Sequence, residues 1–351
     1  MSKKITNKID QILGESELIL NIPNDIDLWN NIYSTLEYQP IFLDSLHLNY
    51  SNLYNNDFYQ IKLGLIKEGK ICGLFSFSII KIKDKYIFES YRNSIYPPFY
   101  IENINKKIKK RYNDELLNLI KKISKLFNDP IINFNVDFLP KFKNNGLSEW
   151  GENLLDSSSD RIIISDSYIN LSLNEDLIKS NIRKSYKPLI TKGLKIWSNE
   201  VYDHVNITTK VWSIFKQLHL DVAGRITRSD FTWNIQLEMI LNRSAIFVAL
   251  YDTISNDMVG GALVLCSRDE AVYSVAAYKR DLFHLPIGHP IQWLIIKKLK
   301  LINVEWYYLG EKYLKNSPDK TSKEINISEF KSGFSTGLYN LIKIKNTFNE
   351  S

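Results

Sequence analysis

The stretch 245–310 carries the clearest pattern of apolar and polar positions in the chain. Short apolar runs separated by polar turns are typical of an antiparallel meander, because each run is long enough for one buried strand. An irregular segment follows, and apolar residues then recur at helical spacing behind a proline, which suits the first turn of a helix. The expected elements are strands at 245–251, 258–266 and 271–277, a helix from Pro290 and a strand at 306–310.

The first half of the chain shows the same order of meander, helix and strand. This common order suggests an internal repeat, with one copy in each half. Before the first copy, Asn24 or Asp25 is expected to cap a helix, whereas 41–48 fits either a short helix or a strand. The expected elements of the copy are strands at 59–66, 71–80 and 86–90, a helix capped by Asn113 and a strand at 131–136.

The polar stretch 140–160, with its run of serines, is the expected boundary between two domains. We therefore expect an N-terminal domain at 1–158 and a C-terminal domain at 159–351. In the second domain, Pro188 is expected to kink or end a basic helix, and Gly193 to be its C-cap. The other expected elements are a strand near 162–173, the start of the basic helix at 174, helices at 210–220 and 229–242 and a last strand at 339–344.

The composition is that of a globular protein with room for about two domains, at 351 residues, 44% hydrophobic and 24% charged. No apolar run reaches the roughly 20 residues that span a bilayer, and the first residues lack the apolar core of a signal peptide. We therefore expect a cytoplasmic protein without a transmembrane segment. The net charge of +6, from 45 basic and 39 acidic residues, favours an anionic partner such as RNA, a nucleotide sugar or a phosphorylated lipid headgroup.

Several common kinds of site find no support in the sequence. Cys72 and Cys266 lie in apolar runs, where a free cysteine acts as a small hydrophobic residue, so neither a disulfide nor a zinc site is expected. Residues 64–71 nearly match a phosphate-binding P-loop, but Ile71 stands where Ser or Thr is required, and we interpret them as a hairpin turn. The sequence has no Ser-His-Asp, HExxH or CxxC arrangement to indicate a hydrolase or a metal site.

Glycines, histidines and basic residues mark a candidate site around 245–310. The adjacent Gly260 and Gly261 in an apolar strand indicate a bulge or a backbone that a donor molecule approaches closely. His284 and His289 precede the expected helix, where a histidine can act as a base or bind an anion; a solvated loop histidine is the alternative. A basic helix face, either phosphate-binding or solvated, is formed by Arg183, Lys184, Lys187, Lys192 and Lys195.

Six segments of the C-terminal half, taken in order, resemble FemABX-type aminoacyltransferases and related GNAT-like proteins of surface-polysaccharide loci. The likeness covers about 174–334, and the order of the motifs carries it rather than any single one. The segments are the basic helix 180–195, Gly-Arg-Ile-Thr-Arg-Ser at 224–229, Val-Gly-Gly-Ala at 259–262, Ile-Gln-Trp-Leu at 291–294, Tyr-Tyr-Leu-Gly at 307–310 and Phe-Lys-Ser-Gly-Phe at 330–334.

This resemblance implies an α+β fold, an α/β sandwich of two tandem GNAT-like domains, each a mixed and mainly antiparallel sheet flanked by helices. It also implies an N-acyltransferase or aminoacyltransferase that binds donor and acceptor at the second domain. The donor would be an aminoacyl-tRNA or an acyl thioester such as acyl-CoA, used as co-substrate without a tightly bound cofactor. The acceptor would be an amine of a nucleotide-linked or lipid-linked amino sugar or peptidoglycan precursor, reached in the cytoplasm or at the inner face of the membrane. DNA is not an expected partner.

The family's Phe-Lys pair maps onto Phe330 and Lys331, and its arginine after the interdomain helix maps onto Arg228 or Arg225. An amine that attacks an ester builds negative charge on the carbonyl oxygen, which a fixed lysine would stabilise. The arginines would bind phosphate oxygens of the donor or acceptor. Packing of Phe330 against Phe334 in a core is the alternative interpretation of the aromatic residues.

One feature departs from the pattern of acetyl-CoA-dependent GNAT enzymes. These have a glycine-rich pyrophosphate loop before the long helix, whereas 279–290 contains only Gly288. The departure puts coenzyme A in doubt and favours aminoacyl-tRNA or a thioester bound in another way. A non-catalytic RNA-binding or scaffold protein that retains the GNAT-like fold is the alternative function.

Overall fold

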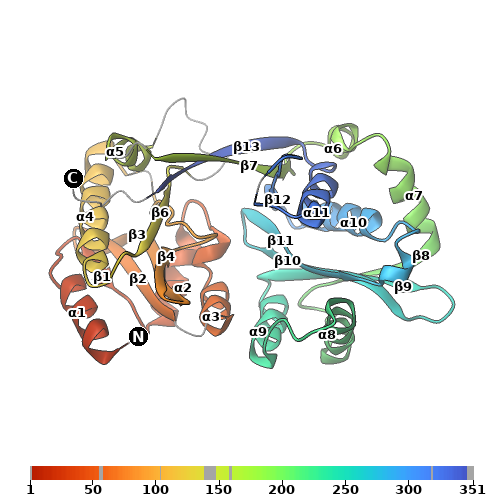
Figure 1. Cartoon of the computed structure of the whole chain (residues 1–351), viewed down its shortest axis with the longest axis horizontal. Coiled ribbons are helices and arrows are strands. Elements are labelled where there is room, and N and C mark those ends of the chain that lie inside the picture. The colour runs from red at the N-terminus through yellow and green to blue at the C-terminus, as the bar shows by residue number, and fades with distance from the viewer. Residues whose placement is uncertain are drawn as a thin grey trace. The chain divides into compact units, whose positions relative to one another are not determined.

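The computed structural model of the protein describes residues 2–54, 58–102, 104–137, 148–157, 160–317 and 319–345 (Figure 1). The chain forms two compact units, one of Met1–Ile164 with Asn340–Ser351 and the other of Ser165–Tyr339. The expected domain boundary, between 158 and 159, lies outside the described residues. The polar stretch before it holds a helix that its composition did not predict, α5 (Glu149–Ser157), whose Trp150 is buried in the core of the first unit.

The first unit is built on an antiparallel meander that ends in a parallel pair of strands. Its strands are β1 (Ile19–Asn21), β2 (Phe58–Lys67), β3 (Lys70–Ile82), β4 (Lys85–Glu89), β5 (Phe99–Tyr100), β6 (Ile131–Asn135) and the end of β13 (Gly337–Lys345). The order is β1-β2-β3-β4-β6-β13, and β5 pairs with β3. All neighbours are antiparallel except β4 and β6, which run in parallel.

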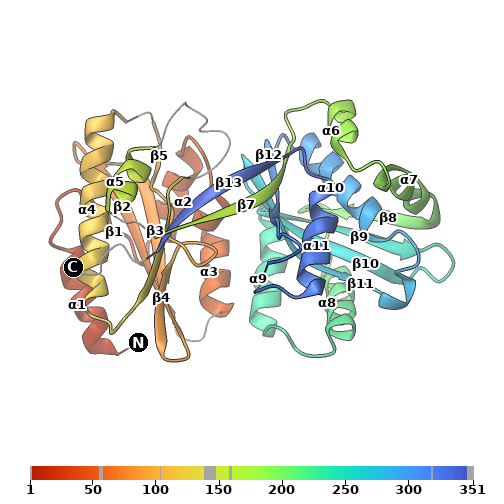
Figure 2. The same ribbon diagram turned by 45° about the horizontal axis from the view of Figure 1, so that its top comes forward.

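Helices cover both faces of this sheet, as Figures 1 and 2 show. They are α1 (Lys3–Leu13), α2 (Ile26–Thr35), α3 (Ser45–Tyr54), α4 (Lys106–Ser124) and α5, with a 3-10 turn at Ile41–Leu43. The segment 41–48, which fitted either a helix or a strand, thus forms this turn and the start of α3. On one face α1, α4 and α5 enclose a core that includes Leu63, Phe77 and Leu116. Helices α2 and α3 lie on the other face.

The second unit repeats the meander with its parallel pair. Its strands are most of β7 (Arg161–Asn170), β8 (Trp197–Tyr202), β9 (Ala245–Asp252), β10 (Met258–Cys266), β11 (Glu270–Tyr278) and β12 (Trp306–Glu311). Strands β8, β9, β10 and β11 pair in that order, all antiparallel. Strand β11 then pairs with β12 in parallel, and β7 pairs with β12 in antiparallel orientation.

Helices also cover both faces of the second sheet. They are α6 (Glu175–Asn181), α7 (Tyr186–Ile196), α8 (Thr209–Ala223), α9 (Asp230–Leu241), α10 (Gly288–Leu301) and α11 (Ser322–Ser332), with a 3-10 turn at Arg280–Leu282. Helices α8 and α9 lie on one face, whereas α10, α7 and α11 lie on the other (Figure 1). Alternation along β9 matches this arrangement, because Ile246 and Val248 join the core with α10, whereas Phe247 contacts Trp212 and Phe215 of α8.

The two units therefore share one order of elements. Each unit begins with a strand and two helices, which are β1, α2 and α3 in the first unit and β8, α8 and α9 in the second. A meander follows, β2-β3-β4 or β9-β10-β11, and then a helix and a strand, α4 and β6 or α10 and β12. The expected fold class is confirmed: the protein is α+β, with two units that each contain a mixed, mainly antiparallel sheet between helices.

The long helix of the first unit begins earlier than the sequence predicted. Asn105, not Asn113, is its N-cap, and the Asn105 side chain accepts a hydrogen bond from the backbone N–H of Ile108 at 3.0 Å. Asn113 is buried inside α4. The reason is that the buried stripe continues toward the N-terminus through Tyr112, so that the basic run before it forms the first turns of the helix.

The basic helix of the second unit is in fact two helices. The chain leaves helical geometry at Ile182, the C-cap of α6, and α7 begins at Tyr186. Pro188 lies in the first turn of α7, where its missing N–H has no helical partner to lose, so it does not kink the helix. Gly193 is not a C-cap but a close-packing position, because a Cβ there would lie 2.6 Å from Pro290 Cγ.

The C-terminal strand also differs from the expected domain assignment. The sequence assigned 340–351 to the second domain, but β13 pairs Lys343, Ile344 and Lys345 with Asn135, Phe134 and Asn133 of β6 in the first unit. Ile344 is fully buried in the core of that unit. The pairing of β13 with β6 has a simple cause, because β6 would otherwise be an edge strand with an apolar face.

Candidate functional site

Four aromatic rings from three elements of the second unit form a compact cluster. They are Tyr186 of α7, His289 of α10 and Phe330 and Phe334 of α11 and its end. The centroids of the His289 and Tyr186 rings are 4.6 Å apart, those of His289 and Phe330 are 5.1 Å apart, and those of Phe330 and Phe334 are 5.4 Å apart. The structure thus brings together two residues that the sequence singled out separately, His289 and Phe330.

Glycines make this close packing possible. A Cβ on Gly288 would lie 2.9 Å from Phe330 Cζ, and a Cβ on Gly333 would lie 2.3 Å from Tyr186 Cε2. The backbone N–H of Arg183 donates to the carbonyl oxygen of Gly333 at 2.8 Å, which fixes the connection between α6 and α7 against the end of α11. The Phe-Lys-Ser-Gly-Phe motif therefore has a glycine at 333 because the ring of Tyr186 leaves no room for a side chain there.

His289 serves this cluster as a neutral ring. Burial lowers its pKa to about 4, so the side chain carries no charge at neutral pH. A neutral imidazole does not attract phosphate as a cation would. The half-buried position among three aromatic rings thus favours a packing contact over the anion-binding role that the loop position suggested.

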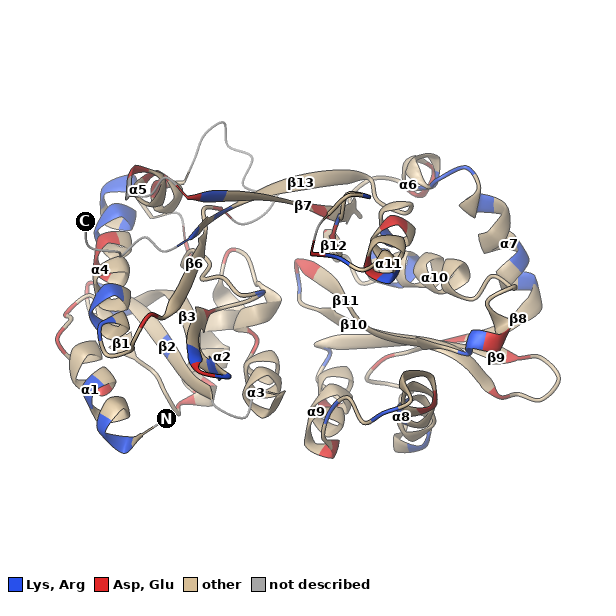
Figure 3. Ribbon diagram, in the orientation of Figure 1, with Lys and Arg blue, Asp and Glu red and all other residues tan. Residues whose placement is uncertain are grey.

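Arg183 places a cation at the rim of the cluster. Its guanidinium carbon lies 5.1 Å from the centroid of the Tyr186 ring, and Nη1 donates to the Tyr186 hydroxyl at 3.3 Å. The side chain is exposed, as are Lys184, Lys187, Lys192 and Lys195 nearby on α7 and before it. Lys187 Nζ donates to the carbonyl oxygen of Ser180 at 3.3 Å. Figure 3 shows basic residues as separate blue segments along α7 and just before it, and we call these five residues the basic face.

Three other predicted residues lie away from the cluster. Arg225 and Arg228 follow α8 on the opposite face of the sheet from α10 and α11 (Figure 1). The Arg228 guanidinium lies 4.8 Å from the centroid of the Trp233 ring, and Nη1 donates to Gln236 Oε1 at 3.3 Å, so this side chain braces α9. His284 is exposed before α10, with Nδ1 3.0 Å from the carbonyl oxygen of Asp281.

Gly260 and Gly261 have a structural explanation. The pairing of β10 with β9 shifts register between Met258 and Gly260, as expected for a bulge. A Cβ on Gly260 would lie 2.7 Å from side-chain carbons of Ile287 and Tyr278, and a Cβ on Gly261 would lie 2.7 Å from Phe247 Cζ. The close approach predicted at these glycines is therefore made by the protein's own side chains.

The parallel strands of the second unit separate beside the aromatic cluster. Strands β11 and β12 pair only from Glu270 and Trp306 to Val272 and Tyr308, although β11 continues to Tyr278. Tyr273 is thus the first residue of β11 past the last pair. In the described part of the second unit, no isolated bridge fills the space between the separated strands. We call the region between the unpaired parts of β11 and β12 the strand gap.

A polar network that sequence reasoning missed borders the strand gap. The Tyr273 and Tyr278 hydroxyls are hydrogen-bonded to each other, and the Tyr307 hydroxyl donates to Gln292 Oε1 at 3.0 Å. The ammonium group of Lys331 lies 5.1 Å from the centroid of the Tyr273 ring. The network therefore connects the predicted Phe-Lys pair to the point where the strands separate.

No local sequence signal marks this network. Tyr273 and Tyr278 are five positions apart, an odd spacing that places residues of a regular strand on opposite faces. The register between β10 and β11 shifts between Leu263 and Val264, which leaves Ser274 as an extra residue. This bulge returns Tyr278 to the face of Tyr273.

Burial keeps the tyrosines of the network protonated. It raises the pKa of Tyr273 to about 12, although the hydrogen bond with Tyr278 opposes the rise. Burial also raises the pKa values of Tyr278 and Tyr307 well above the ordinary value. All three hydroxyls therefore keep their protons at neutral pH.

The N-terminus of α10 is covered by protein. A helix N-terminus binds anions through its unpaired backbone N–H groups. Here Phe330 lies over Gly288, Gly193 of α7 packs on Pro290, and Trp197 Nε1 donates to the carbonyl oxygen of Pro286 at 3.1 Å. These contacts cover part of this helix end.

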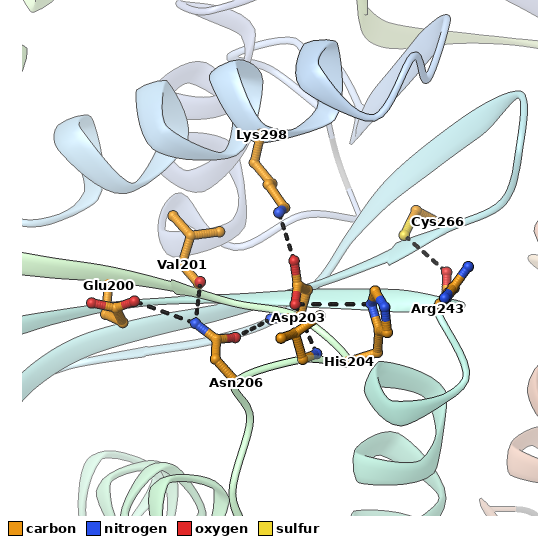
Figure 4. Close-up of polar contacts among 9 residues, drawn as sticks. Glu200, Val201, Asp203, His204, Asn206, Arg243, Cys266 and Lys298 are labelled. Carbon is orange, nitrogen blue, oxygen red and sulfur yellow. Dashed lines mark hydrogen bonds and ion pairs between the residues drawn. The ribbon is translucent and has the colours of Figure 1, made fainter.

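An ion pair holds the other end of α10 in place (Figure 4). Lys298 Nζ lies 2.6 Å from Asp203 Oδ2, just after β8, and the Asp203 backbone N–H donates to Asn206 Oδ1 at 2.8 Å. The hydrogen bond from Lys298 lowers the pKa of Asp203. Both charged side chains are half-buried. The pair therefore fixes α10 against the edge strand, and with it the position of Gln292.

Two further observations limit the chemistry of the described residues. No cluster of three or more His, Cys, Asp and Glu side chains in the described ranges is placed to hold a metal ion. None of the described helices is long and apolar enough to cross a membrane.

Solved structures show where else this architecture occurs. No model of a known protein family matches the sequence, and no curated protein matches it. The structure is similar to FemX, with a TM-score of 0.66 and 12% identity over 92% of this chain and 96% of that one. It is also similar to the C-terminal domain of a putative lysylphosphatidylglycerol synthetase from Agrobacterium fabrum, with a TM-score of 0.58 and 11% identity over 92% and 91% of the two chains. At these identities the likeness establishes the fold, which is FemABX/GNAT-like.

Proposed function

We propose that the protein is an N-acyl or aminoacyl transferase that moves an acyl group from an activated donor to an amino group of a cell-envelope or surface-glycan precursor. The observation that carries the proposal is the strand gap of the second unit, bordered by Lys331 and the tyrosine network. An extended donor or acceptor chain fits between separated strands, where backbone groups are open to it. Lys331 would stabilise the negative charge that develops on the carbonyl oxygen.

The covered N-terminus of α10 favours aminoacyl-tRNA over coenzyme A as donor. Phe330 and Gly193 fill the position at which that helix would bind a pyrophosphate. The basic face on α7, including Arg183 and Lys187, offers exposed cations for the phosphates of a tRNA or of a nucleotide-linked or lipid-linked acceptor. A neighbour of similar fold is named as a synthetase of lysylphosphatidylglycerol, which agrees with an aminoacyl donor.

Binding and transfer assays test the proposal. The melting temperature is measured with acetyl-CoA, a deacylated tRNA pool or UDP-linked amino sugars. Only a ligand that binds the native state should raise it. Radiolabelled aminoacyl-tRNA should then transfer label into an amide of a UDP-linked amino sugar or peptidoglycan precursor. A melting temperature that rises with acetyl-CoA would instead establish a thioester donor. Salt-sensitive tRNA binding without any transfer would support the RNA-binding or scaffold alternative and contradict the proposed reaction.

The assignment of Lys331 has its own test. Lys331→Ala should lower transfer by about 100- to 1000-fold, as for loss of a group that stabilises an oxyanion. Lys216→Ala is the matched control, because Lys216 pairs with Asp230 at 2.7 Å on the helices of the opposite sheet face. Full activity in Lys331→Ala with an unchanged melting temperature would remove Lys331 from the reaction.

A further inference from the structure

The net charge of the chain is concentrated on one helix of the first unit and on the basic face of the second. Helix α4 contains seven basic and two acidic residues, a net charge of +5, whereas the whole chain has +6. The basic face adds five more cations, so the rest of the chain is net negative. Figure 3 shows the basic segments of α4 in blue. The positive charge is therefore a local feature and not a uniform property of the composition.

Most of the cations of α4 lie where the physics of a helix disfavours them. The N-terminus of a helix has a partial positive charge, so cations there are destabilising, and like charges three or four positions apart repel each other. The equivalent helix of the second unit, α10, has its lysines near its C-terminus, where they are favourable. Helix stability thus does not explain the cations in the first six residues of α4, which are Lys106, Lys107, Lys109, Lys110 and Arg111.

Three of these five cations have exposed side chains without an ion pair or side-chain hydrogen bond to any described residue. They are Lys107, Lys110 and Arg111, which we call the α4 patch. Their spacing of three and four residues places them on one side of the helix. The other two have partners, since Lys106 Nζ lies 3.8 Å from Glu149 Oε1 of α5, and Lys109 Nζ lies 5.5 Å from the centroid of the Tyr100 ring. The α4 patch therefore presents three cations to a partner in solution.

A nucleic-acid backbone fits the α4 patch better than a lipid surface does. A helix that lies in a membrane surface buries an apolar face in the bilayer, whereas the apolar stripe of α4 is buried in the core of the first unit. Among the described residues, no large exposed hydrophobic side chain lies on α4 or on α1, which packs against it. The patch therefore meets its partner through charge alone, as Lys and Arg meet the phosphates of RNA.

We propose that the α4 patch binds phosphates of the tRNA donor, so that the first unit holds the RNA while the second unit carries out the transfer. The choice of tRNA among RNA molecules rests on the proposed function. Phosphate contacts do not read the base sequence, so the patch serves different aminoacyl-tRNAs equally. A binding role also accounts for cations that weaken the helix, because proteins break local rules of stability mainly at functional sites.

The test removes the three cations together, in Lys107→Gln/Lys110→Gln/Arg111→Gln, and measures binding of a deacylated tRNA pool over a range of salt concentrations. Each lost phosphate contact should reduce the slope of log affinity against log salt by about 0.7–0.9, so the triple change should reduce it by about 2–3. The affinity near physiological salt should fall by about 10- to 100-fold. The melting temperature should rise, because repulsion at the start of the helix is relieved.

A triple change elsewhere in the first unit is the matched control. Lys81→Gln/Lys83→Gln/Lys85→Gln removes the same charge from exposed positions at the β3–β4 turn. This control should reduce the salt slope by less than the value of about 1 that one phosphate contact contributes.

Transfer kinetics provide a second measurement. The α4 variant should raise the KM for aminoacyl-tRNA by about 10- to 100-fold, the same factor as for binding. Its kcat should not change, because a contact made equally before and during the reaction contributes only to binding. The KM for the acceptor should stay the same.

The outcomes separate this inference from the proposed function. An unchanged tRNA affinity in the α4 variant, or an equal loss in the control, would overturn the inference and leave the proposed function intact. Loss of binding to vesicles of phosphatidylglycerol and phosphatidylcholine, with tRNA binding unchanged, would assign the α4 patch to a membrane instead. Binding of tRNA that depends on the patch but leads to no transfer would contradict the proposed function and retain the RNA-binding surface.

A smaller change covers the case in which the triple variant fails to fold. Lys107→Gln/Lys110→Gln retains Arg111 and should reduce the salt slope by about 1.4–1.8. An unchanged slope in this double variant would overturn the inference.

Discussion

The two units use one order of elements but treat the space between their parallel strands in opposite ways. In the first unit, the pairing of β4 with β6 ends at Phe88 and Ile132. Beyond this point, Ile95 pairs with β6 in place of β4. The Ile95 backbone N–H donates to Asn133 at 2.7 Å, and its carbonyl oxygen accepts from Asn135 at 2.8 Å. The second unit has no such bridge among its described residues. The parallel pair is therefore bridged beyond its last residues in the first unit and not in the described part of the second.

The difference arises from an excursion of the chain in the first unit. Strands β4 and β5 pair with successive parts of β3, at Ser78–Ile82 and at Gly73 and Leu74. In the second unit, β11 runs along β10 without such an interruption, apart from the bulge at Ser274. The segment 90–98, which connects β4 to β5, places Ile95 beside β6 in the first unit. One fold therefore yields a unit in which a bridge follows the parallel pair and a unit without such a bridge, and the proposed function assigns the substrate to the second.

The largest expected effect follows from truncating the side chain of Ile95, whose backbone pairs with β6 in the first unit. Ile95 is fully buried, so Ile95→Ala should lower the free energy of unfolding of the first unit by about 2–5 kcal/mol. Amide hydrogen exchange at Asn135 should accelerate accordingly. Transfer by the folded protein should not change, because the backbone at Ile95 still fills the gap.

The control for this change is Ile95→Val, which should cost only about 0.5–1.5 kcal/mol. A loss of transfer as large as that of Lys331→Ala in folded Ile95→Ala protein would show that the first unit takes part in the reaction. The comparison between a closed and an open unit would then fail.

The second prediction concerns the aromatic cluster beside the open gap. Gly288→Ala adds a methyl group 2.9 Å from Phe330 Cζ, so the ring must move. We expect a stability loss of about 1–3 kcal/mol from overpacking, together with reduced transfer. Gly14→Ala in the first unit is the control, since its nearest neighbours would lie at 3.5 and 3.6 Å, ordinary contact distances. Unchanged transfer in Gly288→Ala would argue that the position of Phe330 is not critical.

The smallest expected effect concerns the ion pair that anchors α10. The pKa of Asp203 is lowered by Lys298, so its contribution to stability is present above the pKa of the unfolded chain and is lost as the pH falls through the folded pKa. Asp203→Asn should lower the stability of the second unit by about 1 kcal/mol or less at neutral pH and have no effect in acid. Thermal melting between neutral and acidic pH measures this difference.

The first unit provides the comparison for this ion pair. Lys85 and Asp129 lie 3.4 Å apart with most of each side chain exposed, so Lys85→Met should change stability by less than about 0.5 kcal/mol at any pH. An Asp203→Asn variant that remains less stable than the unaltered protein at low pH would indicate a steric rather than an electrostatic effect.

Local pattern predicted most elements of both units, and the resemblance to a known family supplied the fold class. Alternating and clustered apolar residues placed the meanders, and the resemblance to FemABX-type proteins identified Phe330 and Lys331, because their motif is contiguous in sequence. Helix ends were harder to predict, as with Asn113, because a side chain suited to capping also fits a buried helical position. Two helices were expected as one at 174–193, because the interruption at Ile182 depends on contacts with α11.

Only the tertiary structure decided which of the candidate residues lie together. Arg228 and Phe330 belong to the same series of motifs, yet the sheet lies between them. Arg183 and His289, which lie far apart in the sequence, both contact Tyr186. The Tyr273 network depends on an extra residue in one strand, and the closed first gap depends on where the excursion at Ile95 returns to the sheet. Such features arise from pairing between distant segments, so periodicity along the chain determined the elements, and long-range strand pairing determined the site.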